Sequence, residues 1–462
     1  MTQLLDFDAL VASQRRYFAK GETRPISFRI QQLKALKKSI LDNEQAILDA
    51  LYADFKKPNF ETWVTEIGII LDEIKTHVAN LKTWAEPQKI SDNLINFPST
   101  NTINTEPLGL ALIIAPWNYP VNLSLTPLVG AISAGNCSVL KPSELTPNTA
   151  KVIHKIIDQA FQNPDYICCI EGGIEETTSL LKQHFDFIFF TGSTAVGKIV
   201  MQAAAQNLTP VCLELGGKSP CIIDQNTDLK LAAKRIVWGK FLNVGQTCIA
   251  PDYVLIHHTL EADFLKYAQQ FITEFYGRDP QKSNDFGRIV SPKHFKRLCR
   301  LLENSNIAVG AKVDENERYI APTVLKSVLW DDEAMKEEIF GPILPVITFK
   351  TIDEAINNIN HYTPKPLALY CFSNNTKTQD RIIQEISCGG VCINDVISHI
   401  ANSKLPFGGV GTSGMGAYHG KYSFDLFSHQ KSITSRSKLI DVPLRYPPYT
   451  DTKLMLAKTI LK

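Results

Sequence analysis

The chain has almost no excess charge of either sign and no long apolar run. Its 462 residues include 48 Lys and Arg against 47 Asp and Glu, which leaves a formal charge of +1 at pH 7. A protein without a basic excess or a dense Lys/Arg run is not expected to bind nucleic acid. The longest apolar stretch, near residues 108–117, is too short for a membrane helix of roughly 20 residues. Because the N-terminus also lacks a signal-peptide pattern, we expect a cytoplasmic protein.

Glycine, proline and cysteine are too sparse to define a special class of protein. The 25 Gly and 25 Pro residues exclude collagen-like and linker-like chains, and a hydrophobic content of 44% excludes disorder. The ten cysteines show no paired CxxC spacing with nearby histidines, so neither a disulfide scaffold nor a metal site is predicted. Most of them are expected to be reduced, buried thiols.

Apolar runs and helical stretches alternate along most of the chain. Residues 1 to about 90 show helical periodicity, and two blocks of alternating strands and helices follow, from about 108 and from about 220. This alternation predicts an α/β fold whose parallel sheets are covered by helices on both faces, and two blocks predict two lobes with a cleft between them. The expected strands are 109–114, 137–140, 185–190 and 211–215, then 253–257, 343–349, 367–372 and 390–393. Ligands bind such sheets beyond the carboxyl ends of the strands, so the residues directly after each run are candidates for a site.

Two of these strand ends have features of a dinucleotide site. The third run ends in a turn that opens a helix, where Gly192 permits a tight turn, Ser193 follows, and Gly197 would let the helix pack closely on a neighbour. Free N–H groups at that helix start could bind a pyrophosphate. Lys141 and Glu144 follow the second run and could hydrogen-bond a ribose. Taken alone, the first segment is more often only an ordinary turn, and the second is better interpreted as a solvated loop.

Four polar side chains are candidates for chemistry. Cys248 lies in a polar turn, unlike Cys137 inside an apolar run, and a thiol in a loop between two lobes is a candidate nucleophile. Glu214 interrupts the fourth run, where desolvation would raise its pKa towards that of a general base, unless an unseen cation pairs with it. Asn118 follows the first run and could donate to an oxyanion. Glu338, just before a strand, has by itself the pattern of a surface acid.

Taken together, these segments resemble the aldehyde dehydrogenase superfamily. Seven motifs occur in the order of that family: Pro-Trp-Asn-Tyr-Pro at 116–120, Lys-Pro-Ser-Glu at 141–144, Phe-Thr-Gly-Ser at 190–193, Leu-Glu-Leu-Gly-Gly-Lys at 213–218, Gly-Gln-Thr-Cys at 245–248, Glu-Ile-Phe-Gly-Pro at 338–342 and Pro-Phe-Gly-Gly at 406–409. The longer variants at 245–253 and 414–421 look like the class 3, fatty aldehyde dehydrogenase-like branch. The start of the chain, almost directly in its first helix, is also similar to that branch.

The resemblance implies how the chain is divided. The expected parts are a Rossmann-like dinucleotide-binding domain (1–93 and 107–210), a second α/β catalytic domain (211–395), a small β oligomerisation element (94–106 and 420–440) and a C-terminal tail (441–462). It also implies a homodimer. The tail combines apolar residues with three lysines at 453–462. It is expected either to dock on the surface or to form an amphipathic segment that covers the substrate entrance or makes weak peripheral contact with a membrane.

The resemblance also implies oxidation of an aldehyde to a carboxylic acid. Cys248 would attack the aldehyde carbon as thiolate, and the Asn118 amide and the Cys248 backbone N–H would hold the oxyanion. Glu214 would activate the water that hydrolyses the thioester, although Glu338 can also reach the site in this branch, so the choice of base stays open. The implied cofactor contacts are Glu338 and Phe340 to the nicotinamide ribose and ring, Lys141 and Glu144 to the adenine-side ribose, and the turn with Gly192, Ser193 and Gly197 to the pyrophosphate.

Cofactor and substrate preference follow from the same comparison. Glu144 beside a ribose hydroxyl would repel a 2′-phosphate, which favours NAD, with NADP tolerated. By similarity to the family, Trp117, Tyr119, Trp238 and Ile69 would line a substrate tunnel. These mostly apolar side chains suit medium- or long-chain aliphatic, aromatic or isoprenoid-derived aldehydes.

Two other functions stay open at this point. An acylating enzyme would pass the thioester to coenzyme A, but enzymes of that type lack the glutamate found here as Glu214. A non-catalytic scaffold built on the same fold is the second alternative, against which the joint presence of Cys248, Asn118, Glu214 and Glu338 argues.

Overall fold

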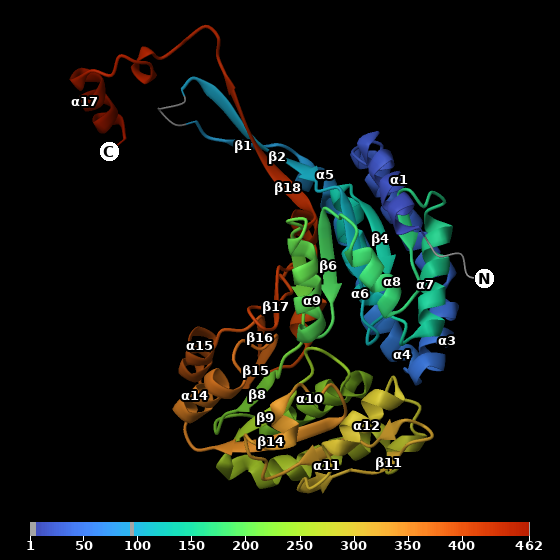
Figure 1. Ribbon diagram of the computed structural model, residues 1–462. Coiled ribbons are helices and arrows are strands. Elements are labelled where there is room, and N and C mark those ends of the chain that lie inside the picture. Colours follow the sequence, from blue (N-terminus) through green and yellow to red (C-terminus); the bar gives the residue numbers. More distant parts are fainter. Residues whose placement is uncertain (1–5, 93–96, 462) are drawn as a thin grey trace.

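Two mostly parallel sheets organise the molecule into two lobes (Figure 1). This computed structural model describes residues 6–92 and 97–461. A six-stranded sheet forms the core of the first lobe and a seven-stranded sheet that of the second, while a separate three-stranded sheet extends away from the first lobe. The α/β fold class that the alternating pattern predicts is therefore confirmed.

The first sheet has the strand order β17-β7-β6-β3-β4-β5. Its strands are β3 (Leu110–Ile114), β4 (Cys137–Lys141), β5 (Ile167–Cys169), β6 (Phe187–Thr191), β7 (Val211–Glu214) and β17 (Gly414–Met415). All neighbours are parallel except β17, which returns antiparallel to β7. The four apolar runs predicted as strands agree with β3, β4, β6 and β7 to within two residues. β5 and β17 were not predicted, because two or three residues give no readable pattern.

The helices of the first lobe cover this sheet, either directly or by packing on helices that contact it. They are α1 (Phe7–Ala19), α2 (Ile26–Asp42), α3 (Glu44–Phe55), α4 (Asn59–Thr62), α5 (Gly68–Ala85), α6 (Asn122–Ala134), α7 (Pro147–Ala160), α8 (Ile174–Leu181) and α9 (Thr194–Ala205), with a π-helical turn η1 (Trp63–Ile67) between α4 and α5. α6 packs on β3 and β4 and is itself covered by α2 and α5, whereas α9 packs on β6 and β7. Every residue of α6 is buried, so it lacks the polar face that would have revealed it as a helix.

The second sheet has the order β10-β13-β14-β9-β8-β15-β16 and is parallel except at β10. Its strands are β8 (Pro220–Ile223), β9 (Tyr253–His257), β10 (Ile307–Val309), β13 (Thr323–Leu325), β14 (Ile343–Phe349), β15 (Ala368–Phe372) and β16 (Gly390–Ile393), and β11 (Val313–Asp314) pairs separately with β12 (Tyr319–Ile320). The helices of this lobe are α10 (Leu229–Phe241), α11 (Glu261–Tyr276), α12 (Pro292–Arg300), α13 (Glu333–Lys336), α14 (Ile352–Tyr362) and α15 (Thr376–Glu385). The four predicted strands of this block are all present, whereas the short strands β8, β10 and β13 were missed.

A thin antiparallel sheet projects from the first lobe (Figure 1). It consists of β1 (Gln88–Ile90), β2 (Ser99–Pro107) and β18 (Ser428–Arg436), which follows the short helix α16 (Lys421–Leu426). β2 and β18 pair along nine residues each. This sheet begins earlier than the expected element at 94–106, and part of that element, residues 94–96, lies outside the described residues. β7 likewise extends the first sheet past the domain boundary expected at 210, because Glu214 still pairs with Thr191.

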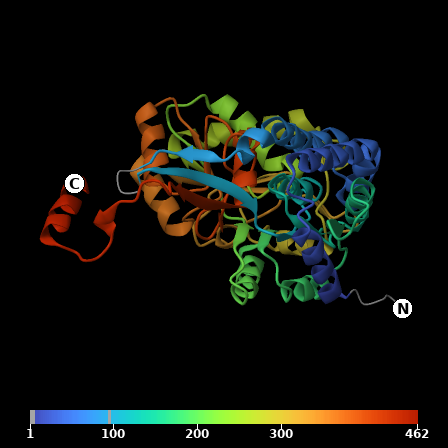
Figure 2. The ribbon, with the colours of Figure 1, turned by 90° about the horizontal axis from the view of Figure 1, so that it is seen from above.

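The C-terminal helix α17 (Asp451–Ile460) lies beyond this sheet and away from both lobes (Figures 1 and 2). Leu454, Met455, Leu456 and Ile460 are exposed, and no described residue of α17 is buried. The structure therefore contradicts the expectation that the tail docks on the surface of its own chain, because the apolar side chains of α17 remain exposed. Within the described residues, no helix is long and apolar enough to cross a membrane.

Candidate active site

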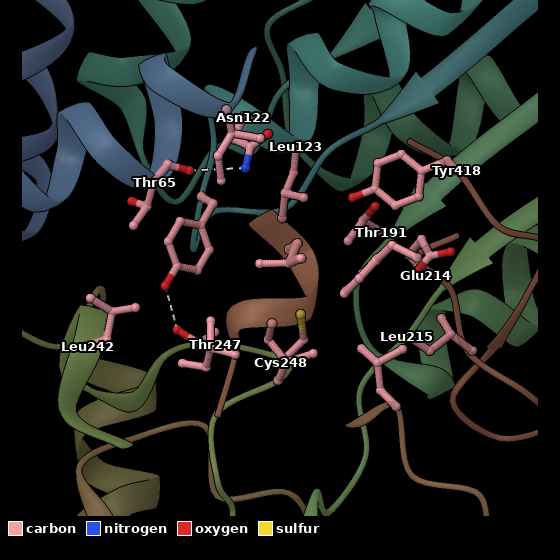
Figure 3. Close-up of a pocket in the computed structure, with 17 residues that line it drawn as sticks. Thr65, Asn122, Leu123, Thr191, Glu214, Leu215, Leu242, Thr247, Cys248 and Tyr418 are labelled. Atoms are coloured by element: carbon pink, nitrogen blue, oxygen red, sulfur yellow. Dashed lines mark hydrogen bonds between the residues drawn. The ribbon is translucent and has the colours of Figure 1, made fainter. Parts of the chain in front are cut away.

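The chain crosses from the first sheet to the second directly after Glu214. This residue ends β7, and β8 begins the second sheet at Pro220. Cys248 comes from the second lobe, in the turn that follows α10 and the 3₁₀ turn η2 (Leu242–Gly245). Cys248 and Glu214 approach the same space from opposite sides (Figure 3). The two residues singled out for a nucleophile and a base are thus brought together by the crossing between the lobes.

The turn before Cys248 is strained. Asn243, Val244 and Gly245 have consecutive φ values of +52°, +58° and +72°. A β-branched residue such as Val244 rarely adopts this left-handed region, and such strain is typical of functional sites. A side chain on Gly245 would meet the Gly341 carbonyl oxygen at 2.3 Å, so only glycine fits there.

Buried amide side chains hold this strained turn. Asn243 Nδ2 donates to the Asn118 carbonyl at 2.8 Å and to the Gln246 carbonyl at 3.1 Å. Gln246 donates to the Arg288 carbonyl at 3.1 Å and accepts from the Val290 N–H at 3.0 Å. Such bonds fix the backbone at the nucleophile before substrate arrives.

Burial and two carboxyls keep the Cys248 thiol protonated at neutral pH. The thiol is half-buried. Its pKa is raised first by burial and then by Glu338 and Glu214. Since the thiolate is the nucleophile, a neighbouring base has to take the proton.

Both neighbouring glutamates have raised pKa values. Burial raises the pKa of Glu214 well above its usual value. Its Oε2 atom has no hydrogen-bond partner and no cation pairs with the residue among the described side chains, so the alternative of a hidden ion pair finds no support. Burial and the charge of Asp252 raise the pKa of Glu338 to about 8, against the opposing effects of Lys218 and Lys240. Glu338 is therefore a half-buried carboxyl that lines a cavity, not the surface acid that its local sequence indicated.

Asn118 lies beside the nucleophile turn. Its Nδ2 donates to the Gln246 carbonyl at 3.1 Å. The amide nitrogen carries two N–H groups, so a second donor is left for an oxyanion. The side chain is buried and lines the same cavity as Cys248.

An apolar cavity of about 60 Å³ lies on one side of Cys248 (Figure 3). Its walls include Ile69 and Tyr119, as expected for substrate contacts, but also side chains that the sequence did not indicate: Leu242, Leu367, Ile397, Ile400, Phe407 and Tyr418. Trp238 is 43% exposed on α10 and is not part of the described lining of this cavity.

A larger, more polar cavity of about 670 Å³ lies on the other side. Trp117 lines this cavity rather than the apolar one, and its ring packs edge-on against Phe340 at 5.3 Å between centroids. Glu338 and Phe340 also line it, as do Gly192, Ser193, Thr194 and Ala195 at the start of α9. Its volume is within the usual range for cofactor sites.

The helix start in this cavity is built as expected for a pyrophosphate. The hydroxyl of Ser193 caps α9 by accepting the Val196 N–H at 3.4 Å. A Cβ on Gly197 would lie 2.7 Å from Leu215, so glycine allows α9 to pack on the crossing segment. Lys141, the last residue of β4, forms an ion pair of 3.0 Å with Glu144, and both residues are outside the described lining of this cavity. The residues present fit a dinucleotide whose phosphates meet the α9 N-terminus.

The sequence profile of the aldehyde dehydrogenase family matches residues 2–433. The chain belongs to the aldehyde dehydrogenase family. This confirms the resemblance seen in the seven motifs, the expected fold and the enzyme class, an oxidoreductase that acts on aldehydes.

Relatives cover nearly the whole of this aldehyde dehydrogenase. It is 51% identical to the 4,4′-diaponeurosporen-aldehyde dehydrogenase of Staphylococcus aureus, over 94% of this chain and 95% of that protein. It is 50% identical to aldehyde dehydrogenase family 3 member A2 of Pongo abelii, over 97% of this chain and 92% of that protein. The solved structure of the substrate-bound state of Staphylococcus aureus AldH superposes with a TM-score of 0.96 at 49% identity, covering 99% of both chains. An indole-3-acetaldehyde dehydrogenase in complex with NAD+ superposes with a TM-score of 0.84 at 25% identity, covering 93% of this chain and 88% of that one.

Proposed function

We propose that this enzyme oxidises apolar aldehydes to carboxylic acids with NAD, through a thioester on Cys248. The observation that carries the proposal is the position of this thiol. It lies where an apolar cavity meets a polar cavity, near the buried carboxyl of Glu214 and the half-buried carboxyl of Glu338. NAD bound in the polar cavity supplies the hydride acceptor.

The first half-reaction forms the thioester. One of the two glutamates, in its ionised form, takes the thiol proton, and the Cys248 sulfur attacks the aldehyde carbon. The free N–H of the Asn118 amide and the backbone N–H of Cys248 hold the oxyanion that forms. Loss of hydride from the same carbon then leaves the acyl group on sulfur.

The second half-reaction hydrolyses the thioester. We assign the water-activating role to Glu214, because it lines both cavities together with Cys248, whereas Glu338 lines only the polar one. In its ionised form, a carboxyl with a raised pKa is a stronger base than an ordinary carboxylate and accepts a proton from water. The presence of Glu214 also argues against transfer of the acyl group to coenzyme A, because water must not compete in that reaction.

The proposed cofactor contacts come from both lobes. The α9 N-terminus with Gly192 and Ser193 would hold the pyrophosphate, and Glu338 and Phe340 would hold the nicotinamide ribose and ring. Lys141 and Glu144 would contact the adenine-side ribose beyond the cavity. A carboxylate at that ribose repels a 2′-phosphate, which favours NAD over NADP.

The apolar cavity favours an extended apolar aldehyde. Its walls are mostly aliphatic and aromatic, so few polar substituents could be matched there. Two relatives, 51% and 50% identical to this chain, are named 4,4′-diaponeurosporen-aldehyde dehydrogenase and aldehyde dehydrogenase family 3 member A2. We propose a long-chain or isoprenoid-derived aldehyde as the substrate.

We further propose a cytoplasmic homodimer. All ten cysteines are free thiols, which fits a reducing compartment. β18 is an edge strand with mostly exposed residues, and such an edge pairs readily with another chain. Sedimentation of the purified protein tests the dimer.

Replacing the nucleophile tests the proposed reaction. Cys248→Ala should abolish oxidation of a long-chain aldehyde while NAD binds within about threefold of the wild-type affinity, because the thiol makes the covalent intermediate but does not hold the dinucleotide. Cys388→Ala is the matched control, since this half-buried thiol is outside the described lining of both cavities, and it should keep full activity. Substantial turnover by Cys248→Ala would falsify the proposal. A chain-length series of aldehydes, assayed with both NAD and NADP, tests the preferences.

A further inference from the structure

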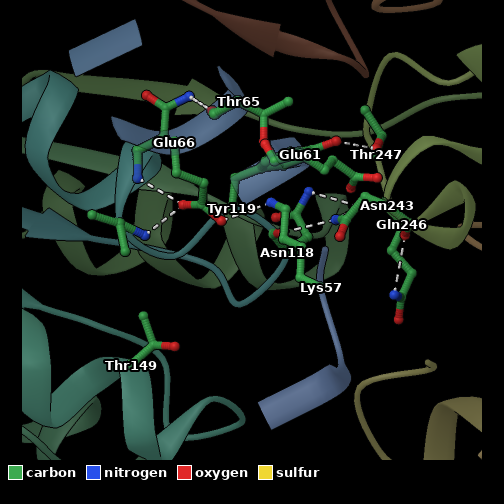
Figure 4. Close-up of polar contacts among 12 residues, drawn as sticks. Lys57, Glu61, Thr65, Glu66, Asn118, Tyr119, Thr149, Asn243, Gln246 and Thr247 are labelled. Carbon is green, nitrogen blue, oxygen red and sulfur yellow. Dashed lines mark hydrogen bonds and ion pairs between the residues drawn. The ribbon is translucent and has the colours of Figure 1, made fainter. Parts of the chain in front are cut away.

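A buried ion pair lies behind the active-site turn and has no part in the chemistry above (Figure 4). Lys57 and Glu66 are both fully buried, with Lys57 Nζ 2.8 Å from Glu66 Oε1. Glu66 belongs to the π-helical turn η1, a rare conformation that is frequent at functional sites. Its other oxygen accepts the Val121 and Asn122 N–H groups at 2.9 and 3.0 Å. The carboxylate is thus fixed from three sides and in turn fixes the ammonium.

The Lys57 ammonium points at an active-site ring. Its Nζ lies 4.0 Å from the ring centroid of Tyr119, within the range of a cation–π contact. The Tyr119 hydroxyl is 2.6 Å from Thr247 Oγ1 (Figure 4), and Thr247 directly precedes Cys248. A continuous set of contacts therefore connects the N-terminal helices to the backbone of the nucleophile.

The same ring is adjacent in sequence to Asn118. A shift of Tyr119 would therefore move both the proposed oxyanion donor and, through Thr247, the thiol. Misplacement of reacting groups by about 1 Å costs up to about a hundredfold in rate. Burying an ammonium away from water costs desolvation free energy, so we expect the contact between Lys57 and this ring to serve a function.

We infer that Lys57 is a positioning residue for Cys248, acting through the Tyr119 ring and its hydroxyl bond to Thr247. Glu66 holds the lysine in place, and the lysine holds the ring. The inference rests on the proposed role of Cys248 as the nucleophile. A purely structural ion pair would instead stabilise the fold without acting through the tyrosine hydroxyl.

A double-mutant cycle separates these two roles. Lys57→Met removes the charge, Tyr119→Phe keeps the ring and removes the hydroxyl, and the double variant combines them. The readout is the rate at which iodoacetamide alkylates Cys248, located by peptide mass spectrometry, together with kcat and KM. We expect each single variant to lower the alkylation rate and kcat about tenfold. In the Tyr119→Phe background, Lys57→Met should add less than about twofold.

Two outcomes would overturn the inference. One is a full tenfold effect of Lys57→Met in the Tyr119→Phe background, and the other is a wild-type alkylation rate in Tyr119→Phe alone. The second outcome does not depend on whether Lys57→Met folds. If it does not fold, Lys57→Met combined with Glu66→Gln removes both charges and replaces it in the cycle.

A matched control shows that the effect is local. The exposed Lys20, directly after α1, lies 5.9 Å from the ring centroid of the buried Tyr17, so Lys20→Met removes another cation–π contact outside both cavity linings and should leave alkylation unchanged. The cycle reads the reactivity of one thiol, not turnover. Turnover by Cys248→Ala would therefore refute the proposed function while the cycle would still report whether Lys57 positions that thiol.

Discussion

The two cavities that meet at Cys248 differ in almost every physical property. The apolar one holds about 60 Å³ and is walled by aliphatic and aromatic side chains. The polar one holds about 670 Å³ and includes charged residues such as Lys218, Arg297 and Glu338. Five residues line both: Leu123, Thr191, Glu214, Leu215 and Cys248.

This difference shows how the site separates two requirements. An acyl group on sulfur is protected in the apolar cavity, where unwanted water is excluded. A dinucleotide needs hydrogen-bond partners and charge, which the polar cavity supplies. The nucleophile and its base lie on the boundary, so each change below should affect one side, the other, or the boundary itself.

The largest effect is expected from a change of Glu214, which lies where the two cavities meet. Glu214→Gln should form the thioester but hydrolyse it about 10²–10³-fold more slowly, because the amide cannot take a proton from water. Stopped-flow measurement of NADH should show a rapid burst followed by a slow steady state. Loss of the burst would instead mean that Glu214 orients the thiol, and Glu338 would become the candidate base.

A change on the polar side should be nearly as large. A Cβ on Gly216 would lie 1.9 Å from Glu338 Oε2, so Gly216→Ala must displace this carboxyl. We expect kcat/KM for NAD to fall about a hundredfold. Gly217→Ala is the matched control, because a Cβ there meets its nearest atom at 3.5 Å and the backbone N–H is kept. Equal losses in the two variants would show that the effect is general strain in the crossing segment.

The two cavities also differ in how far the sequence predicts them. The polar cavity is built at strand ends, and Gly192 and Glu214 are recognisable because each interrupts or ends an apolar run. The motifs then add Glu338 and Phe340, which local pattern alone would leave on the surface.

The apolar cavity is assembled from segments without a readable period. Ile397 has a φ of +65° in an irregular loop, and Phe407 and Tyr418 come from a glycine-rich stretch that returns to the first sheet. The contact between Lys57 and Tyr119 is likewise set by tertiary packing alone. No spacing in the sequence marks these residues, because what they share is a position in space.

A smaller, pH-dependent effect should distinguish the two carboxyls. The raised pKa of Glu338, about 8, means that this group is neutral below pH 8 and charged above it. The charge of Glu338 raises the pKa of the Cys248 thiol. In the Glu338→Gln variant, Cys248 should therefore be alkylated as fast as in the wild type at pH 6 and severalfold faster at pH 9. Rates measured with iodoacetamide across this range check the sign. A constant ratio at all pH values would show that Glu338 does not titrate in the range.

The smallest effect is expected from the C-terminal tail on the apolar side. Truncation after Tyr449 removes α17, which has no described buried residue, so the melting temperature should stay within about 1 °C of wild type. α17 lies away from both lobes (Figure 1) and contributes no residue to the described lining of the apolar cavity, so it can act on substrate only through a second copy or a membrane. In either case a tail of this length gives weak contact, and kcat/KM should fall a few-fold for long-chain aldehydes and remain unchanged for short ones. Equal values for both chain lengths would leave the tail without a role at the substrate entrance. A large drop in melting temperature would mean instead that α17 packs in an assembly, which sedimentation of the truncated protein would then show.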